Sequence, residues 1–390
     1  MVGSLAEADL HVVNSCTVTH LAAHDSRKTA GRARRRGLPA RTVLTGCHVS
    51  ARPEEAARIA GVDLIVPNAE KDRLLARVHA AFPEAIPGVG NPEPIPCAPL
   101  PFANTRALVK VEDGCNMRCA FCVIPFTRGP QHSRPLPEVV AEVRDLVRRG
   151  HREVVVTGVQ ISAYRWGAAR LGGLVRAILT ETDVPRLRLT SIAPWELDDR
   201  LLELWTDRRL CRHLHLSLQS GSTATLRRMR RPYTAEGYLD LLDGIRAAVP
   251  GVAVTTDVIV GFPGETEEEA AESLATVAAA GFAKVHVFPY SPRPGTEAER
   301  LPGPVDPGEK KERMERMLAA AARAERGFQR SHLGKRETVL WERPKDGMGQ
   351  GLTDNYLRVI CAAGAALRNR FSEVELMEIA EGGIAGRIVA

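Results

Sequence analysis

Short apolar runs alternate with amphipathic stretches through the first 82 residues of the chain. The apolar runs, which predict strands, are residues 10–13, 41–44 and 62–66. The stretches between them, at about 25–36 and 53–60, have the spacing of helices. Strands that alternate with helices along a chain form a parallel sheet. We therefore predict an open parallel α/β domain over residues 1–82.

The same alternation occurs six times from residue 105 to about residue 291, within a predicted domain of residues 102–330. The predicted strands are 107–111, 153–157, 186–190, 213–218, 252–260 and 284–289, and the helices are 136–149, 171–180, 198–205, 235–248 and 267–280. Six such units with right-handed crossovers curve into a partial (βα)6, TIM-like barrel. Residues 309–329 predict a helix that follows it. In such barrels the functional residues lie on loops after the strands' carboxyl ends.

Two further segments have a different pattern. Residues 83–101 contain seven prolines, which predict an extended linker between domains. In residues 331–390, four short apolar runs separated by Gly, Pro and Asp turns predict a small β-barrel. These runs are 339–341, 351–353, 357–360 and 373–379. The barrel segment holds eight Lys and Arg against eight Asp and Glu, so its charge does not indicate RNA binding.

Composition narrows the class of protein. The net charge of +6 is compatible with a nucleic-acid partner but does not require one. No apolar run is long enough to cross a membrane, which predicts a cytoplasmic protein without a membrane partner. Eight cysteines in that compartment favour metal binding over disulfides.

Three of the cysteines lie on one loop, directly after the first predicted barrel strand. Cys115, Cys119 and Cys122 have the spacing Cys-x3-Cys-x2-Cys. Three thiolates can hold three irons of a [4Fe–4S] cluster and leave the fourth iron open. Structural zinc would need a fourth ligand, and the nearest candidate is His132, ten residues further on. Zinc and inert cysteines are the weaker alternatives.

Two more cysteines lie in the first domain. Cys16 and Cys47 each follow a predicted strand, and the carboxyl ends of parallel strands meet at one sheet edge. They are either shared ligands or two small buried residues. The basic stretch at 25–36 is either a solvated helix face or a contact for an RNA backbone.

Other strand ends of the barrel carry polar or glycine-rich residues. Gln219 and Ser220 follow the fourth strand, and Gly261 and Glu265 follow the fifth. A glycine allows backbone to approach a ligand closely. Glu265 either caps the next helix or holds a ligand.

The cysteine loop, with Phe121 before its last cysteine, resembles the motif of the radical S-adenosylmethionine (SAM) superfamily. The whole chain is similar to the methylthiotransferase branch of that superfamily, in segments 14–19, 45–47, 216–222, 229–233, 257–265 and 286–291. Residues 353–356 resemble the C-terminal RNA-binding (TRAM) domain of the bacterial tRNA threonylcarbamoyladenosine methylthiotransferases.

The resemblance implies two [4Fe–4S] clusters and SAM as cofactors. Cys115, Cys119 and Cys122 would hold the cluster that cleaves SAM, and Cys16 and Cys47 would be ligands of a second cluster that carries sulfur. Phe121 would lie against the adenine. Gln219, Ser220, Gly261 and Glu265 would line the cofactor site. No catalytic residue beyond the cluster ligands is implied.

The implied reaction is methylthiolation at C2 of N6-threonylcarbamoyladenosine, next to the anticodon of a tRNA. The implied partners are the anticodon loop, a low-potential electron donor and a sulfur donor, and we expect a monomer. Alternatives are an isopentenyl-adenosine tRNA or a ribosomal-protein aspartate as substrate. Another is a non-catalytic RNA-binding relic with a single cluster.

One departure from the family affects the second cluster. Its third cysteine, with the first strand and helix of the domain, precedes the match to Cys16 and is absent from this chain. We therefore expect the true start to lie upstream of Met1. Mass spectrometry of the native N-terminus tests this, and a mature protein that begins at Met1 would contradict it.

Overall fold

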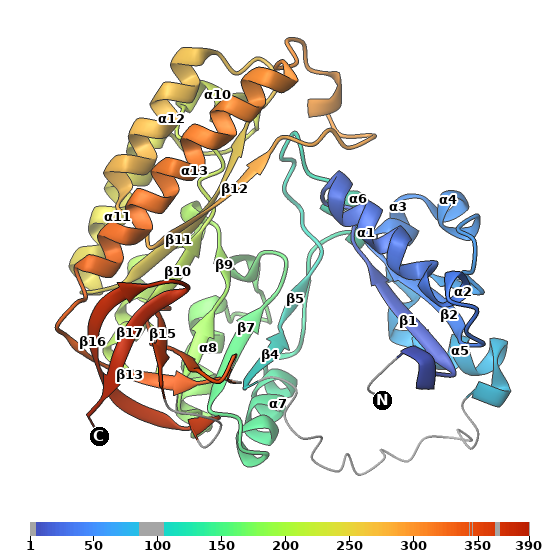
Figure 1. Ribbon diagram of the computed structural model, residues 1–390, viewed down its shortest axis with the longest axis horizontal. Coiled ribbons are helices and arrows are strands. Elements are labelled where there is room, and N and C mark those ends of the chain that lie inside the picture. The colour runs from blue at the N-terminus through green and yellow to red at the C-terminus, as the bar shows by residue number, and fades with distance from the viewer. Residues whose placement is uncertain (1–4, 86–104, 343, 345, 363–366, 390) are drawn as a thin grey trace. The chain divides into compact units, whose positions relative to one another are not determined.

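The computed structural model describes residues 5–85, 105–342, 344, 346–362 and 367–389. The chain forms two compact units (Figure 1). Among the described residues, unit 1 comprises 5–85, 114–130 and 291–300, and unit 2 comprises the rest. Most of the predicted linker, including Cys97, lies outside the described residues.

Unit 1 is built on a three-stranded parallel sheet of β1 (Leu10–Ser15), β2 (Arg41–Gly46) and β3 (Leu64–Val66), in that order. Its helices are α1 (His20–Ala30), α2 (Arg32–Arg35), α3 (Cys47–Ala51), α4 (Pro53–Ala57), α5 (Leu74–Ala81) and α6 (Ile124–Arg128). Val13 and Leu44 pack on one face of the sheet with Val49 and Ala56. Val43 belongs to a separate buried cluster. Because strand residues alternate between faces, this confirms an open parallel sheet packed on both sides.

The helices of unit 1 differ from the prediction at their ends. The basic helix starts at His20 rather than Asp25, because the Thr19 side chain accepts a hydrogen bond from the Ala22 N–H and caps it. The helix is interrupted at Gly31, and α2 follows. Helix α3, which begins at Cys47, was not predicted.

Unit 2 contains the predicted six-strand repeat. Its strands are β4 (Arg106–Lys110), β7 (Glu153–Thr157), β8 (Leu187–Leu189), β9 (Ser191–Ile192), β10 (His213–Leu216), β11 (Ala253–Val260) and β12 (Lys284–Pro289). These strands form two hydrogen-bonded sheets, β4-β7-β8 and β9-β10-β11-β12. In both sheets neighbouring strands are parallel and follow chain order. Thr190 separates β8 from β9 within the third predicted strand. The prediction of a partial parallel barrel is confirmed.

Helices surround these strands and bury their apolar faces. They are α7 (Leu136–Arg148), α8 (Leu171–Glu181), α9 (Asp199–Leu202), α10 (Thr223–Arg228), α11 (Ala235–Ala248), α12 (Glu267–Ala280) and α13 (Pro307–Arg330). Helix α13 packs against β12 and α12, as Figure 1 shows. A short antiparallel pair, β5 (Glu112–Asp113) with β6 (His132–Ser133), was not predicted.

The C-terminal segment is a closed five-stranded barrel, as predicted from its turns. Its strands are β13 (Arg336–Trp341), β14 (Gly349–Leu352), β15 (Arg358–Cys361), β16 (Phe371–Ala380) and β17 (Gly383–Ile388), in the order β13-β14-β15-β17-β16. Trp341, Val359 and Val374 are fully buried in its core. The prediction missed β17. None of the helices in the described part of the chain is both long and apolar enough to cross a membrane.

Two arginines of the parallel barrel, Arg188 and Arg212, join it to the C-terminal barrel within unit 2. Arg188 on β8 donates to both carboxylate oxygens of Glu153 on β7, over 2.7 and 3.2 Å. The same guanidinium donates to the backbone carbonyls of Thr353 and Asp354, over 3.2 and 2.8 Å. Arg212 adds a two-point contact to the Asp354 carboxylate, over 2.7 and 2.9 Å. The turn at 353–356, which marked the family resemblance, therefore fixes the C-terminal barrel to the parallel barrel.

Candidate functional site

The three-cysteine loop is a compact turn within unit 1. The Cys115 N–H donates to the Gly129 carbonyl over 3.2 Å, which closes the segment on itself. Gly114 has φ +75, and a Cβ there would lie 2.2 Å from the Pro130 carbonyl oxygen. Only glycine fits this close approach. The loop geometry is therefore set by residues on both sides of the cysteines.

The cysteines of this loop are partly exposed, unlike ordinary core thiols. The Met117 N–H donates to the Cys115 sulfur over 3.4 Å, and the Cys122 N–H donates to the Cys119 carbonyl over 3.1 Å. Phe121 is half-buried beside them. Hydrogen bonds from backbone N–H groups to sulfur are a feature of iron–sulfur sites, where they tune the cluster.

Cys16 and Cys47 leave the same edge of the unit 1 sheet. The preceding residues, Ser15 and Gly46, are partners in the parallel register of β1 and β2. Gly46 has φ +101, and a Cβ on it would lie 2.4 Å from the Ser15 carbonyl oxygen. The close approach of the strand ends therefore depends on a glycine before Cys47.

The sulfur of Cys47 has two polar neighbours that the sequence did not indicate. Arg128 donates to it from Nε over 3.4 Å, and Asn68 from Nδ2 over 3.6 Å. Asn68 also donates to the Thr127 carbonyl over 3.0 Å. Helix α6, which follows the three-cysteine loop, therefore packs beside Cys47. The Cys16 sulfur, which is partly exposed, accepts from the Val18 N–H over 3.5 Å.

The donor chemistry of these residues fits iron–sulfur clusters better than a single ion. Among the described residues, no three His, Cys, Asp or Glu side chains converge to hold one metal ion. A cubane cluster places its sulfur ligands on different irons, so they do not have to meet at one point. The three part-exposed thiols at 115, 119 and 122 fit such a cluster.

The other predicted site residues lie in unit 2, after the carboxyl ends of β10 and β11. Gln219 has φ +67 and is paired to β11 through Asp257 and Ile259. Ser220 is buried, and its hydroxyl contacts the Ser273 hydroxyl over 3.1 Å. The Ser220 side chain therefore braces its loop against α12.

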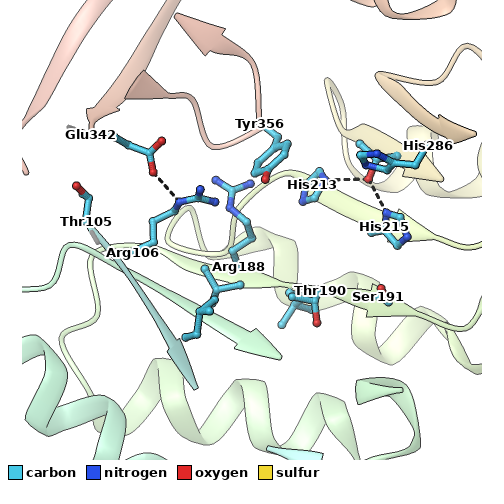
Figure 2. A pocket seen from close by; sticks show the side chains of 14 residues that line it. Thr105, Arg106, Arg188, Thr190, Ser191, His213, His215, His286, Glu342 and Tyr356 are labelled. Carbon is cyan, nitrogen blue, oxygen red and sulfur yellow. Dashed lines mark hydrogen bonds and ion pairs between the residues drawn. The ribbon is translucent and has the colours of Figure 1, made fainter. Parts of the chain in front are cut away.

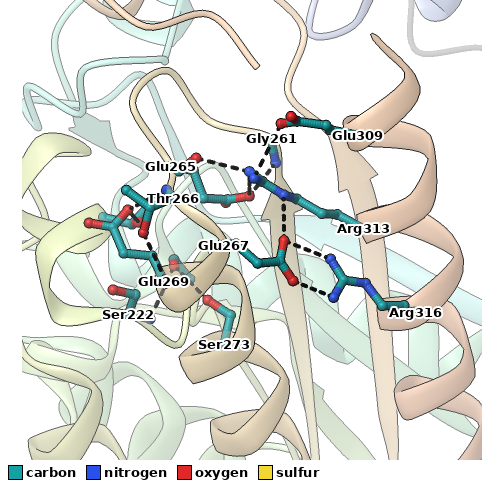
Figure 3. A network of polar contacts seen from close by, with 12 residues as sticks. Ser222, Gly261, Glu265, Thr266, Glu267, Glu269, Ser273, Glu309, Arg313 and Arg316 are labelled. Carbon is teal, nitrogen blue, oxygen red and sulfur yellow. Dashed lines mark hydrogen bonds and ion pairs between the residues drawn. The ribbon is translucent and has the colours of Figure 1, made fainter. Parts of the chain in front are cut away.

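Glu265 forms an ion pair rather than a helix cap (Figure 3). Its carboxylate accepts from Arg313 on α13 over 2.9 Å and from the Gly261 N–H over 3.0 Å. Helix α12 is capped by Thr266 in a reciprocal arrangement with Glu269. The capping alternative for Glu265 is therefore wrong. Burial raises the pKa of Glu265, against the opposing effect of its hydrogen bonds from Gly261 and Arg313.

Sequence reasoning missed another buried acid, Glu112, which directly follows the first predicted barrel strand and is the first residue of β5. It is almost fully buried, and its carboxylate accepts from the Gln160 N–H over 2.8 Å. Burial raises the pKa of this carboxyl. A charged residue directly after an apolar strand was the available signal.

Parallel strands in chain order, with a Cys-x3-Cys-x2-Cys loop after the first, define the radical-SAM class of proteins. The profile of the radical SAM superfamily matches residues 109–277, and that of uncharacterized protein family UPF0004 matches residues 1–67. The solved structure of TsrM, a radical S-adenosylmethionine methyltransferase from Kitasatospora setae, has a similar fold. Its superposition on this chain has a TM-score of 0.54 at 18% sequence identity and covers 72% of this chain and 64% of TsrM.

Curated relatives narrow the class. Threonylcarbamoyladenosine tRNA methylthiotransferase MtaB of Bacillus subtilis (strain 168) is 35% identical over 390 residues, 95% of this chain and 86% of the relative. The tRNA-2-methylthio-N(6)-dimethylallyladenosine synthase of Jannaschia sp. (strain CCS1) is also 35% identical, over 98% of this chain and 86% of the relative. The chain belongs to the radical-SAM tRNA methylthiotransferase family. Membership implies one [4Fe–4S] cluster and SAM.

Proposed function

We propose that this protein methylthiolates C2 of N6-threonylcarbamoyladenosine in tRNA by radical-SAM chemistry. The main support for this proposal is the near full-length similarity to enzymes named for this reaction, from Bacillus subtilis and Chlamydia pneumoniae. The three-cysteine loop after β4 supplies the matching chemistry. Because the substrate is tRNA, we place the protein in the cytoplasm. We also propose a monomer that takes electrons from a low-potential donor and sulfur from a separate donor.

The cysteines at 115, 119 and 122 hold the cluster in this proposal. When bound, the cluster and SAM supply the radical chemistry, and the protein supplies orientation and exclusion of water. Phe121, Gln219 and Gly261 contact the cofactor. Ser220 and Glu265 hold their loops in position through Ser273 and Arg313.

Cys16 and Cys47 bind a second cluster in this proposal. Their placement at one sheet edge and the N–H donors to both sulfurs support it. Iron analysis of the anaerobically reconstituted protein tests this part alone. Two cubane clusters give about eight irons per chain and one gives about four. An iron content near four per chain in the wild-type protein, with the same content in Cys47→Ala, would contradict the second cluster.

We propose the division 1–82, 102–330 and 331–390, with a linker at 83–101, as the functional modules. The first would carry sulfur, the second would generate the radical, and the third would bind RNA.

A second candidate substrate is the dimethylallyladenosine of tRNA, favoured by the Jannaschia relative at equal identity. Nucleoside mass spectrometry of tRNA from a deletion strain separates the two substrates. We expect loss of the methylthio group from threonylcarbamoyladenosine, with dimethylallyladenosine unchanged. The wild-type gene and Cys361→Ala, a buried cysteine of the C-terminal barrel, should restore the modification, and Cys119→Ala should not. The reverse nucleoside pattern would support the second candidate.

A further inference from the structure

A cavity of about 740 Å3 lies at the amino-terminal end of the parallel barrel (Figure 2). Arg106 and His213 line it from the first residues of β4 and β10, and Arg188 lines it from the middle of β8. Tyr356 lines it from the C-terminal barrel. Thr255 on β11 also lines it, six positions before Gly261. Six strand residues span roughly 20 Å. The cavity is therefore separate from the carboxyl-end loops proposed to hold SAM.

One wall of the cavity carries a chain of hydrogen bonds. The Thr255 hydroxyl lies 3.1 Å from His213 Nε2 and 3.0 Å from His215 Nδ1. His215 Nε2 lies 3.2 Å from a carboxylate oxygen of Asp257. In the arrangement that pairs every one of these atoms, His215 donates to the carboxylate and accepts from Thr255, whose oxygen accepts from His213. His213 Nδ1 then remains an unprotonated acceptor.

The neutral state of His213 agrees with its surroundings. His213 is only 6% exposed. Burial, and then the positive charge of Arg188, lowers the pKa of His213 well below its ordinary value. The imidazole therefore stays uncharged at neutral pH and offers a lone pair, not a cation.

Two buried polar atoms of this lining lack a hydrogen-bond partner among the described residues. They are Nδ1 of His213 and the hydroxyl of Thr190. A buried polar atom left unpaired costs about 1–3 kcal/mol, so such atoms are normally paired with protein, water or ligand. A ligand that displaces the covering side chains and carries a donor for His213 and an acceptor for Thr190 would satisfy both atoms.

The charges of the lining do not favour an ion. Arg188 is paired with Glu153, and Arg106 donates to Glu342 over 2.8 Å. Each guanidinium is thus neutralised by a carboxylate. No three His, Cys, Asp or Glu side chains in the described chain converge as metal ligands. The lining therefore suits a neutral polar molecule better than phosphate or a metal ion.

Aromatic rings in the lining favour a planar ligand. Tyr356 stacks on His213 with ring centroids 4.4 Å apart and an interplanar angle of 18°. The His215 and His286 rings lie 6.0 Å apart on the same wall. Planar ligands stack favourably on such surfaces.

We propose that this cavity binds a neutral, planar nitrogen heterocycle of nucleoside size. Its volume falls within the range of small-molecule sites, about 300–1,000 Å3. An exocyclic amino group would donate to His213, and a ring nitrogen would accept from Thr190. This site lies outside the proposed tRNA reaction and does not depend on it.

Adenosine is the probe. Calorimetric titration uses the full chain, reconstituted with cluster and saturated with SAM without reductant, so that adenosine cannot occupy the cofactor end. We expect wild type to bind adenosine, and Thr190→Val and His286→Ala each to weaken binding about tenfold, the effect of one lost contact. His24→Ala, an exposed histidine on α1, is the matched control and should bind as wild type.

The ligand is located by 15N-histidine NMR on the same protein. Adenosine should shift the Nδ1 resonance of His213, assigned by its loss in His213→Gln. Absence of binding, or binding unchanged in Thr190→Val, would overturn the proposal. So would inorganic phosphate, zinc or glucose shifting the His213 resonance at concentrations where adenosine does not.

Discussion

Arg128 donates a hydrogen bond from Nε to the sulfur of Cys47 over 3.4 Å. Arg128 lies six residues after Cys122 in sequence, on the short helix α6. The segment that carries the three-cysteine loop thus provides a positive charge to a cysteine at the end of β2. A guanidinium beside a ligand sulfur stabilises its negative charge and tunes an attached cluster.

Removing this contact should weaken the proposed second cluster selectively. We expect Arg128→Ala to lower the iron content towards about four per chain, one cubane cluster, while SAM cleavage continues. Iron analysis and 5′-deoxyadenosine release, measured on one preparation, test this. Arg36→Ala, an exposed arginine after α2, is the control, and an equal loss in both variants would contradict the assignment.

The glycine before Cys47 should be irreplaceable. Gly46→Ala combines an unfavourable φ with a Cβ only 2.4 Å from the Ser15 carbonyl oxygen. Gly37 also has a positive φ, but nothing lies within 4 Å of its Cβ position. We expect Gly37→Ala to cost about 1 kcal/mol, the strain of the left-handed conformation.

The Gly46→Ala variant should lose more stability than Gly37→Ala, and iron bound through Cys47 as well. Urea unfolding and iron analysis of the two variants give the comparison. Equal unfolding free energies and equal iron contents in the two alanine variants would contradict this and show that the ends of β1 and β2 can move apart.

The buried Glu153–Arg188 pair should be important for stability. Glu153 is fully buried and Arg188 is 2% exposed. Removing one partner of a buried ion pair typically costs about 3–5 kcal/mol, because the other charge is left uncompensated. We expect this loss in Glu153→Gln by urea unfolding. Glu54→Gln, whose side chain is 87% exposed, should change stability by less than about 0.5 kcal/mol.

The same pair predicts a pH dependence. Burial alone would raise the pKa of Glu153, but the charge and hydrogen bonds of Arg188 outweigh it and lower this pKa below 4.5. A lowered folded-state pKa gives stability that is complete above the unfolded-state pKa and is lost as pH falls through the folded one. The stability difference between wild type and Glu153→Gln should therefore be constant above about pH 5 and shrink below it. A difference that grows on acidification would contradict this.

Local patterns predicted the strands well and the partners of charged residues poorly. Cys16 and Cys47 follow β1 and β2 as expected, because apolar runs and turn residues mark strand ends locally. The role of Glu265 was not predictable, since its partner Arg313 is 48 residues further on. Nothing in the spacing of the chain indicates that these two side chains meet.

Short or weakly patterned elements were missed for a related reason. Helix α3 has only five residues, too few to show a helical period. Strand β17 contains two glycines and lacks the alternation of a strand pattern. It is paired because β15 and β16 need a neighbour to close the barrel. Tertiary pairing, not local propensity, determines such elements.

The turn at 353–356 illustrates the same limit. The short apolar runs and turns around it predicted the small barrel correctly. The structure uses these residues for attachment: Asp354 pairs with Arg212, and Tyr356 stacks on His213. The contacts are between segments more than a hundred residues apart, and no sequence signal specified them.

The reaction itself is tested most directly by following one hydrogen atom. The reconstituted protein is given tRNA whose threonylcarbamoyladenosine carries deuterium at C2, together with SAM and a reductant. We expect deuterium to appear in 5′-deoxyadenosine and the nucleoside to gain a methylthio group. With Cys119→Ala we expect neither deuterium transfer nor methylthiolation. Methylthiolated product with no deuterium in 5′-deoxyadenosine, or 5′-deoxyadenosine with no change to the tRNA, would contradict the proposed reaction.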